Sequence, residues 1–387
     1  MHDVIPPLLA TAQAVADLCQ EARKHLLVGI DTEADSFHSY HHKLCLIQIS
    51  FSGVHALIDP LAVDRDGLQP LSDVLADPDV TVLMHGADYD VRVLDRDLGA
   101  RVAGLRDTQV AAQLLGEEHT GLAALLQAYL GVLLDKRFQR ADWSQRPLSA
   151  DLLRYAVNDT AHLAALSTVL EAQLRARGRL EWWHEECAAL EAIRWEPSPV
   201  DPLAFDRMKG ASRLQGEDRD RLAALYHWRD QTARSRDAAP FRVLRNEILL
   251  AVASAAPTTA AELAVVPGVS PGVVRRWGRD LLRVLAAVTP APARQVRPRL
   301  EVDRQREERL RALREIRDGL AVELSLLPGV LAPRAALEAV VDGSPNSLPA
   351  LTICLQRRWR ALVLAPVLLP VVASWTQGTG RTGGTVS

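Results

Sequence analysis

Short apolar runs in the first part of the chain predict β-strands. Residues 26–30 form a continuous apolar run, and residues 44–51 are rich in leucine and isoleucine. Residues 55–58 follow a Ser-Gly pair that suits a hairpin turn, and residues 80–84 form another apolar run. Three strands in close succession, then one among helices, predict a mixed sheet with an antiparallel edge.

Helical periodicity replaces these runs after residue 90. A proline-rich break at residues 195–199 ends this first segment, and a second break begins at residue 289. The chain after the first break is helical in pattern, and residues 376–387 hold mostly Gly, Thr and Ser, which predicts a disordered tail. Helices in the first segment are expected over residues 91–98, 108–115, 122–130 and 148–174.

The two helical segments after the first break repeat each other. The pattern Arg-Leu-x-Ala-Leu at 221–225 recurs at 309–313, and Arg-Arg-Trp at 275–277 recurs at 357–359. Matches in the same order indicate two copies of one small helical domain. The second copy is shorter and is expected to be degenerate.

The composition is that of a globular protein, but its charge is uneven. Of the 387 residues, 48% are hydrophobic and 24% charged, which excludes collagen, coiled coil and disorder throughout. Residues 1–200 carry a net charge of −12, and residues 201–387 carry +9 with an arginine-rich composition. An acidic half that gathers cations and a basic half that meets phosphates would explain this pattern. Solvated arginine-rich helix faces would explain the basic half equally well.

Cysteine usage and the apolar runs indicate a cytoplasmic protein. The four cysteines form no Cys-x-x-Cys pair, which argues against a disulfide scaffold or a structural zinc site. The first residues lack the pattern of a signal peptide. The longest apolar run, residues 361–375, is too short to span a bilayer, so we expect no membrane partner. The oligomeric state stays open.

Several acidic residues lie at spacings that bring their side chains to one face of a strand or helix, and these are the candidate catalytic residues. Asp31 and Glu33 follow the first apolar run, and positions i and i+2 of a strand project from one face. Asp90 begins a helix after another strand, while Tyr155 and Asp159 share one face of a helix. Neighbouring carboxylates repel one another unless a cation neutralises them.

In this order the acidic residues resemble the DEDD family of 3′–5′ exonucleases, and Tyr155 marks the DEDDy branch. The helical repeats resemble the HRDC (helicase and ribonuclease D C-terminal) domain. Asp88 competes with Asp90 for the third carboxylate, and we choose Asp90 because its spacing from His85 matches the family. Four further segments resemble ribonuclease D proteins: residues 44–49, 107–109, 134–136 and 142–148.

The resemblance implies a fold and a set of domains. The first domain would be an α/β ribonuclease-H-like exonuclease with a mixed sheet, followed by two all-α HRDC-type domains. The expected boundaries are 1–196 for the exonuclease, 201–288 for the first HRDC domain, 300–375 for the degenerate second copy and 376–387 for the tail.

The resemblance also implies a catalytic site. Two divalent cations, Mg²⁺ or Mn²⁺, would be held by Asp31, Glu33, Asp90 and Asp159, because oxygen ligands favour hard ions. Asp31, Glu33 and Asp159 would hold the ion that activates water, and Asp31 would bridge to a second ion near Asp90. Tyr155 would orient the attacking water through its hydroxyl.

The implied activity is release of nucleoside 5′-monophosphates from RNA with a free 3′ end, with precursor tRNA as the expected substrate. These motifs do not determine specificity for RNA over DNA, since that specificity depends on contacts to the 2′-hydroxyl. A DNA-directed 3′–5′ exonuclease of the helicase-linked type, acting on single-stranded DNA, is therefore an alternative. A non-catalytic nucleic-acid-binding relative is another.

Overall fold

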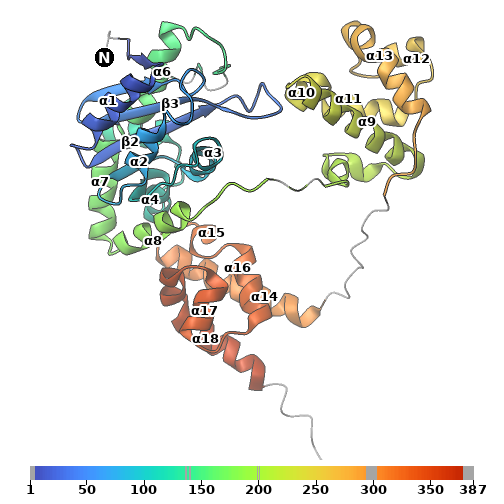
Figure 1. The fold of residues 1–387 in the computed structure, drawn as a ribbon. Coiled ribbons are helices and arrows are strands. Elements are labelled where there is room, and N and C mark those ends of the chain that lie inside the picture. The colour runs from blue at the N-terminus through green and yellow to red at the C-terminus, as the bar shows by residue number, and fades with distance from the viewer. Residues whose placement is uncertain are drawn as a thin grey trace, which may run out of the picture. The chain divides into compact units, whose positions relative to one another are not determined.

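The computed structural model describes residues 5–135, 137–138, 141–197, 199, 201–292 and 303–377 (Figure 1). The chain divides into two compact units. The first unit comprises Met1–Glu33, Leu44–Trp195 and Leu300–Ser387, and the second comprises Ala34–Lys43 and Glu196–Arg299. The domain boundaries expected from the sequence stay a prediction.

A mixed six-stranded sheet forms the centre of the first unit, which confirms the predicted mixed sheet. Its strand order is β1-β4-β3-β2-β5-β6. The pair β3–β4 is antiparallel, with Ile47 opposite Ile58, whereas both outer pairs, β1–β4 and β5–β6, are parallel. The predicted antiparallel edge was therefore wrong, because the short strands β1 and β6 add to either side. The strands are β1 Leu8–Leu9, β2 Leu27–Ala34, β3 Leu44–Phe51, β4 Val54–Ile58, β5 Thr81–Met84 and β6 Leu105–Asp107.

Helices flank the sheet, and one predicted helix is divided. The stretch 148–174 forms two helices that meet at His162, whose backbone φ of −110° and ψ of 0° interrupt the helix. The helices of this part are α1 Ala12–Ala22, α2 Gln69–Leu75, α3 Asp88–Leu98, α4 Thr108–Leu115, α5 Leu122–Leu130, α6 Ala150–Ala161, α7 Leu163–Ala176 and α8 Leu180–Glu191.

The C-terminal helices of the first unit share the hydrophobic core of the sheet domain. Leu313, Leu337 and Leu364 are fully buried in the same cluster as Leu114 and Trp183. Helix α18 also packs against α8. These helices are α14 Arg304–Glu323, α15 Pro328–Leu331, α16 Arg334–Gly343, α17 Leu348–Leu355 and α18 Arg358–Gln377.

Helix α18 is the one helix among the described residues that is long and apolar enough to cross a membrane. The apolar run 361–375 forms most of this helix, which starts before residue 361 and continues through Pro366 and Pro370. Its Leu364, Leu368 and Val372 are buried in the core of the first unit, although only 28% of the window Arg358–Trp375 is buried. Its end, Gln377, takes in the first two residues of the predicted tail, and the rest of that tail lies outside the described residues.

The second unit is helical and has its own core, centred on Phe205, Leu222 and Trp277. The segment Ala34–Lys43 belongs to this unit: the Tyr40 hydroxyl donates to Asp230 at 2.8 Å. Its elements are the 3₁₀ turns Ala204–Arg207 and Ala211–Arg213, and α9 Gly216–Ser235, α10 Pro240–Val243, α11 Asn246–Ala255, α12 Ala260–Ala264 and α13 Pro271–Ala286.

The structure confirms the repeat seen in the sequence. Helices α14, α15 and α16 begin and end 88 residues after α9, α10 and α11. One internal contact recurs at the same offset. Arg229 donates to the Leu244 carbonyl at 3.0 Å, and Arg317 donates to the Ala332 carbonyl at 2.6 Å. The two copies therefore close the turn after their first helix with the same arginine.

Candidate active site

Strand β2 presents two carboxylates to helix α6. The predicted run 26–30 continues as a strand to Ala34, with Val28 and Ile30 buried in the core on the opposite face. At Gly29, on the carboxylate face, an added Cβ would lie 3.2 Å from the Thr160 carbonyl oxygen. Glycine thus lets α6 approach β2 closely, just before the strand reaches its acidic residues.

Helix α6 supplies the third carboxylate. Its first turn is capped by Ser149, whose hydroxyl accepts from the Leu152 amide at 3.3 Å. One carboxylate oxygen each from Asp31, Glu33 and Asp159 lies within 4.8 Å of the other two. The structure therefore brings together three of the predicted ligands at the interface of β2 and α6.

The fourth carboxylate, Asp90, comes from the first turn of α3. Its side chain is 7% exposed and accepts from the Thr32 hydroxyl at 2.5 Å. Asp88 instead is exposed and pairs with Arg92, at 3.2 Å between Asp88 Oδ1 and Arg92 Nη2. Asp107 fixes the entry to this helix by accepting from backbone amides of the preceding loop. Of the two candidates, Asp90 is thus the one held beside β2.

Burial raises the pKa values of all four carboxyl groups, and repulsion from the other acids of the cluster adds to this at Asp31 and Glu33. The pKa of Asp31 lies well above its ordinary value because of burial and the nearby charges of Asp90, Asp159 and Glu33. Burial, with repulsion from neighbouring acids, raises the pKa of Glu33 to about 8. Burial raises the pKa of Asp159 to about 7 and that of Asp90 to about 6. A cluster of buried carboxyl groups that repel one another when ionised fits a hard divalent cation, which would neutralise their charge.

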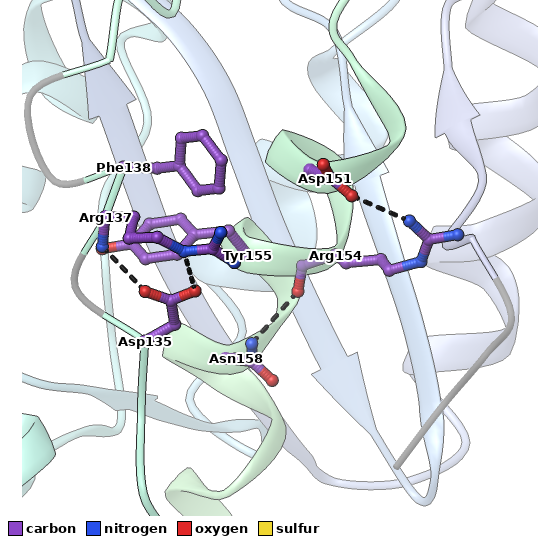
Figure 2. Close-up of a pocket in the computed structure, with 7 residues that line it drawn as sticks. All are labelled: Asp135, Arg137, Phe138, Asp151, Arg154, Tyr155 and Asn158. Atoms are coloured by element: carbon purple, nitrogen blue, oxygen red, sulfur yellow. Dashed lines mark hydrogen bonds and ion pairs between the residues drawn. The ribbon is translucent and has the colours of Figure 1, made fainter.

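Tyr155 lies one helical turn before Asp159 and borders a small pocket of about 150 Å³ (Figure 2). Its ring meets Phe138 edge-on at 5.7 Å between centroids and stacks with Trp143 at 6.2 Å. Burial, with repulsion from Asp159 and its acidic neighbours, raises the pKa of the hydroxyl, so it keeps its proton at neutral pH. The pocket is lined by Asp135, Arg137, Phe138, Asp151, Arg154, Tyr155 and Asn158.

Sequence reasoning assigned no role to the residue that fastens the loop before α6. Arg146 forms a bidentate pair with Asp59, with both contacts at 2.6 Å, and donates to the Trp143 carbonyl at 2.8 Å. This loop holds Trp143 against the Tyr155 ring. The segment 142–148 was singled out by resemblance, but its partner Asp59 is distant in sequence. Lys136, in the segment 134–136, lies outside the described residues.

The sequence and the fold are similar to known nucleases. Residues 8–175 match the family model described as 3′-5′ exonuclease, and residues 218–285 match the HRDC domain. A ribonuclease D from Acidiphilium cryptum is 34% identical over 293 residues, which cover 74% of this chain and 73% of that protein.

Two solved structures extend the similarity. The catalytic core of RRP6 from Trypanosoma brucei has a TM-score of 0.67 at 28% identity, covering 74% of this chain and 80% of that one. Escherichia coli RNase D, described as an exoribonuclease involved in structured RNA processing, has a TM-score of 0.65 at 27% identity. That match covers 96% of this chain and all of the other, so the likeness includes the helical segments.

Proposed function

Because the chain belongs to the ribonuclease D family of 3′–5′ exoribonucleases, we propose that it shortens RNA from free 3′ ends and releases nucleoside 5′-monophosphates. Precursor tRNA is the proposed substrate. The observation that carries this function is the carboxylate cluster of Asp31, Glu33 and Asp159, whose oxygens lie within 4.8 Å of one another. An acidic cluster alone would repel a phosphodiester, so the activity depends on divalent cations.

The proposed roles of the residues are those that the family resemblance implies. Asp31, Glu33 and Asp159 would hold one cation, and Asp31 and Asp90 would contribute to a second cation position. Two ions of Mg²⁺ or Mn²⁺, when bound, supply neutralisation of the phosphate and activation of the attacking water. The Tyr155 hydroxyl, protonated at neutral pH, orients that water by hydrogen bonding.

The two helical copies have different proposed roles. The first copy, matched by the HRDC model, binds RNA through exposed arginines such as Arg275 and Arg279. The second copy packs into the core of the nuclease unit and supports it. The proposed location of the protein is the cytoplasm.

The experiment that tests this function uses the full chain, a 3′-extended tRNA and a single-stranded DNA with a free 3′ end. We expect mononucleotide release from the RNA with Mg²⁺ or Mn²⁺ and none with EDTA. Asp31→Asn removes a charge shared by both cation positions, so it should lower the rate by about a thousandfold while the protein stays folded. Faster digestion of the DNA would support the DNA-directed alternative. RNA binding without any hydrolysis would support a non-catalytic relative.

A further inference from the structure

Gln48 is a buried amide whose polar atoms have no partner. It lies in the middle of β3, is 0% exposed, and neither Nε2 nor Oε1 makes a hydrogen bond to any described residue. Buried side-chain amides are nearly always hydrogen-bonded, and an exception calls for a physical explanation such as a water, an ion or a functional role. Two unsatisfied atoms on one side chain make this exception a costly one.

The side chain of Gln48 faces helix α6, which carries Tyr155 and Asp159. On the same strand, the Ser50 hydroxyl lies 2.6 Å from the Thr160 hydroxyl of α6. Leu46 belongs to the cluster that includes Ala156 of α6. Since alternate residues of a strand share a face, Gln48, between Leu46 and Ser50, points to α6 as well.

The neighbouring strand places Asp31 beside it. Strands β2 and β3 are adjacent, and their connection is too short for the crossover that parallel strands need, so they run in opposite directions. Gly29 of β2 lies against Ser50, with its added Cβ 3.6 Å from the Ser50 carbonyl oxygen. Two residues further along β2 is Asp31, and two residues back along β3 is Gln48. Both project from the face that carries the carboxylate cluster.

We propose that Gln48 is a positioning residue of the metal centre, whose amide N–H groups donate to the Asp31 carboxylate when that carboxylate holds a cation. This inference rests on the proposed function. The amide leaves the charge of the site unchanged, whereas lysine or arginine would compete with the cation and another acid would add repulsion. Ligands of metal ions are commonly oriented by such outer hydrogen bonds. The bond would also satisfy the buried donor.

The test replaces the amide by a thioether of similar length, Gln48→Met, in the full chain. Isothermal titration with Mn²⁺ should show affinity lower than wild type by about 10- to 100-fold. The melting temperature in EDTA should not fall, because the substitution removes unsatisfied buried polar atoms. Exonuclease activity should fall at limiting Mn²⁺ and recover in part when Mn²⁺ is raised.

The matched control is Ile49→Met, the next residue on β3, which is 1% exposed and packs on the opposite face of the sheet. Its Mn²⁺ affinity should stay within about twofold of wild type. A second variant, Gln48→Asn, keeps an amide but withdraws it by one methylene group, and should also weaken Mn²⁺ binding.

The outcomes separate this inference from the proposed function. Wild-type Mn²⁺ affinity in Gln48→Met, or in Gln48→Asn if the first variant does not fold, would overturn the positioning role. Equal losses in Gln48→Met and Ile49→Met would also overturn it, because strand repacking would then explain both. If the wild-type protein itself binds no divalent cation, the proposed metal centre fails instead.

Discussion

Neighbouring acidic residues of the site differ in how they are held, and this difference decides their chemistry. Asp90 is buried and accepts from Thr32, which belongs to the same strand as the two other acids. Asp88 lies two positions earlier on the same helix, is exposed, and is neutralised by Arg92. Asp88 is therefore exposed to solvent, whereas Asp90 is held beside the strand that carries Asp31 and Glu33.

The first prediction compares these two aspartates. Asp90→Asn should lower the rate of mononucleotide release by at least about a hundredfold, because it removes a buried charge from the proposed cation site. Asp88→Asn, the matched control, should stay within about twofold of wild type. Initial rates on a short single-stranded RNA at saturating Mg²⁺ measure both. The reverse result would mean that the third acidic motif is displaced by two residues.

The second prediction concerns pH and metal removal. The folded state holds protons on the buried acids more tightly than the unfolded chain, so stability in EDTA should fall as pH rises. For Glu33 this loss of stability should develop between pH 4.5, its ordinary pKa, and about pH 8, its pKa in the folded protein. Melting temperatures across this range measure the slope. Glu33→Gln should flatten the slope, and saturating Mg²⁺ or Mn²⁺ should flatten it for the wild type. A wild-type slope in EDTA that is already flat would argue against repulsion within the cluster.

At the scale of elements, the sequence predicted the helices and strands that a local pattern of residues indicates. Continuous apolar runs were enough to predict the core strands, and the order of the motifs was enough to nominate the acids. No Gly or Pro lies within residues 148–174 to indicate that the helix is divided at His162. The two-residue strand Leu8–Leu9 forms only because it pairs with β4, which is distant in sequence. Thr32 and Arg146 were missed for the same reason: their partners, Asp90 and Asp59, are distant in sequence.

Helix α8, absent from the sequence prediction, connects two parts of the first unit. On one side, the Trp183 indole donates to the Asp107 carbonyl at 2.8 Å. On the other, Glu186 accepts from Arg357 at 2.9 Å and from Trp359 at 2.9 Å. The helix thus connects Asp107, which fixes the entry to α3, with the second helical copy.

The third prediction tests this connection. Glu186→Gln leaves Arg357 and Arg360, which are largely buried, without their shared carboxylate. Breaking such a pair should lower the free energy of unfolding by about 3 kcal/mol, measured by urea denaturation of the full chain. Glu181→Gln, on the same helix but 86% exposed, is the control and should change stability by less than about 0.5 kcal/mol. Equal effects of the two substitutions would contradict a structural role for the buried pair.

At the scale of the whole molecule, the repeated Arg-Arg-Trp motif lies in a different environment in each copy. In the second copy, Arg357 pairs with Glu186, and Trp359 stacks on Trp182 at 4.6 Å between ring centroids. In the first copy, Arg275 is exposed and has no ion-pair partner among the residues that the structure describes. The sequence revealed the repeat, but it could not show this difference, because the difference lies in the surface that each copy meets.

The last prediction follows from this contrast. Truncation after residue 200 would remove core side chains such as Leu364, so point substitutions are the cleaner test of RNA binding. The double variant Arg275→Gln, Arg279→Gln removes two exposed arginines of α13 and should weaken binding of 3′-extended tRNA. The slope of log affinity against log salt should become shallower by about 0.7 to 0.9 for each lost phosphate contact, measured between about 50 and 200 mM salt.

Arg357→Gln, at the position that corresponds to Arg275 in the repeat, provides the matched comparison. It should lower the melting temperature, because it breaks a largely buried ion pair, and leave the salt slope unchanged. If the double variant in α13 keeps both the affinity and the slope of the wild type, its arginines are a solvated helix face. The RNA would then have to be held elsewhere, and the net charge of +9 over residues 201–387 would not reflect phosphate binding by this helix.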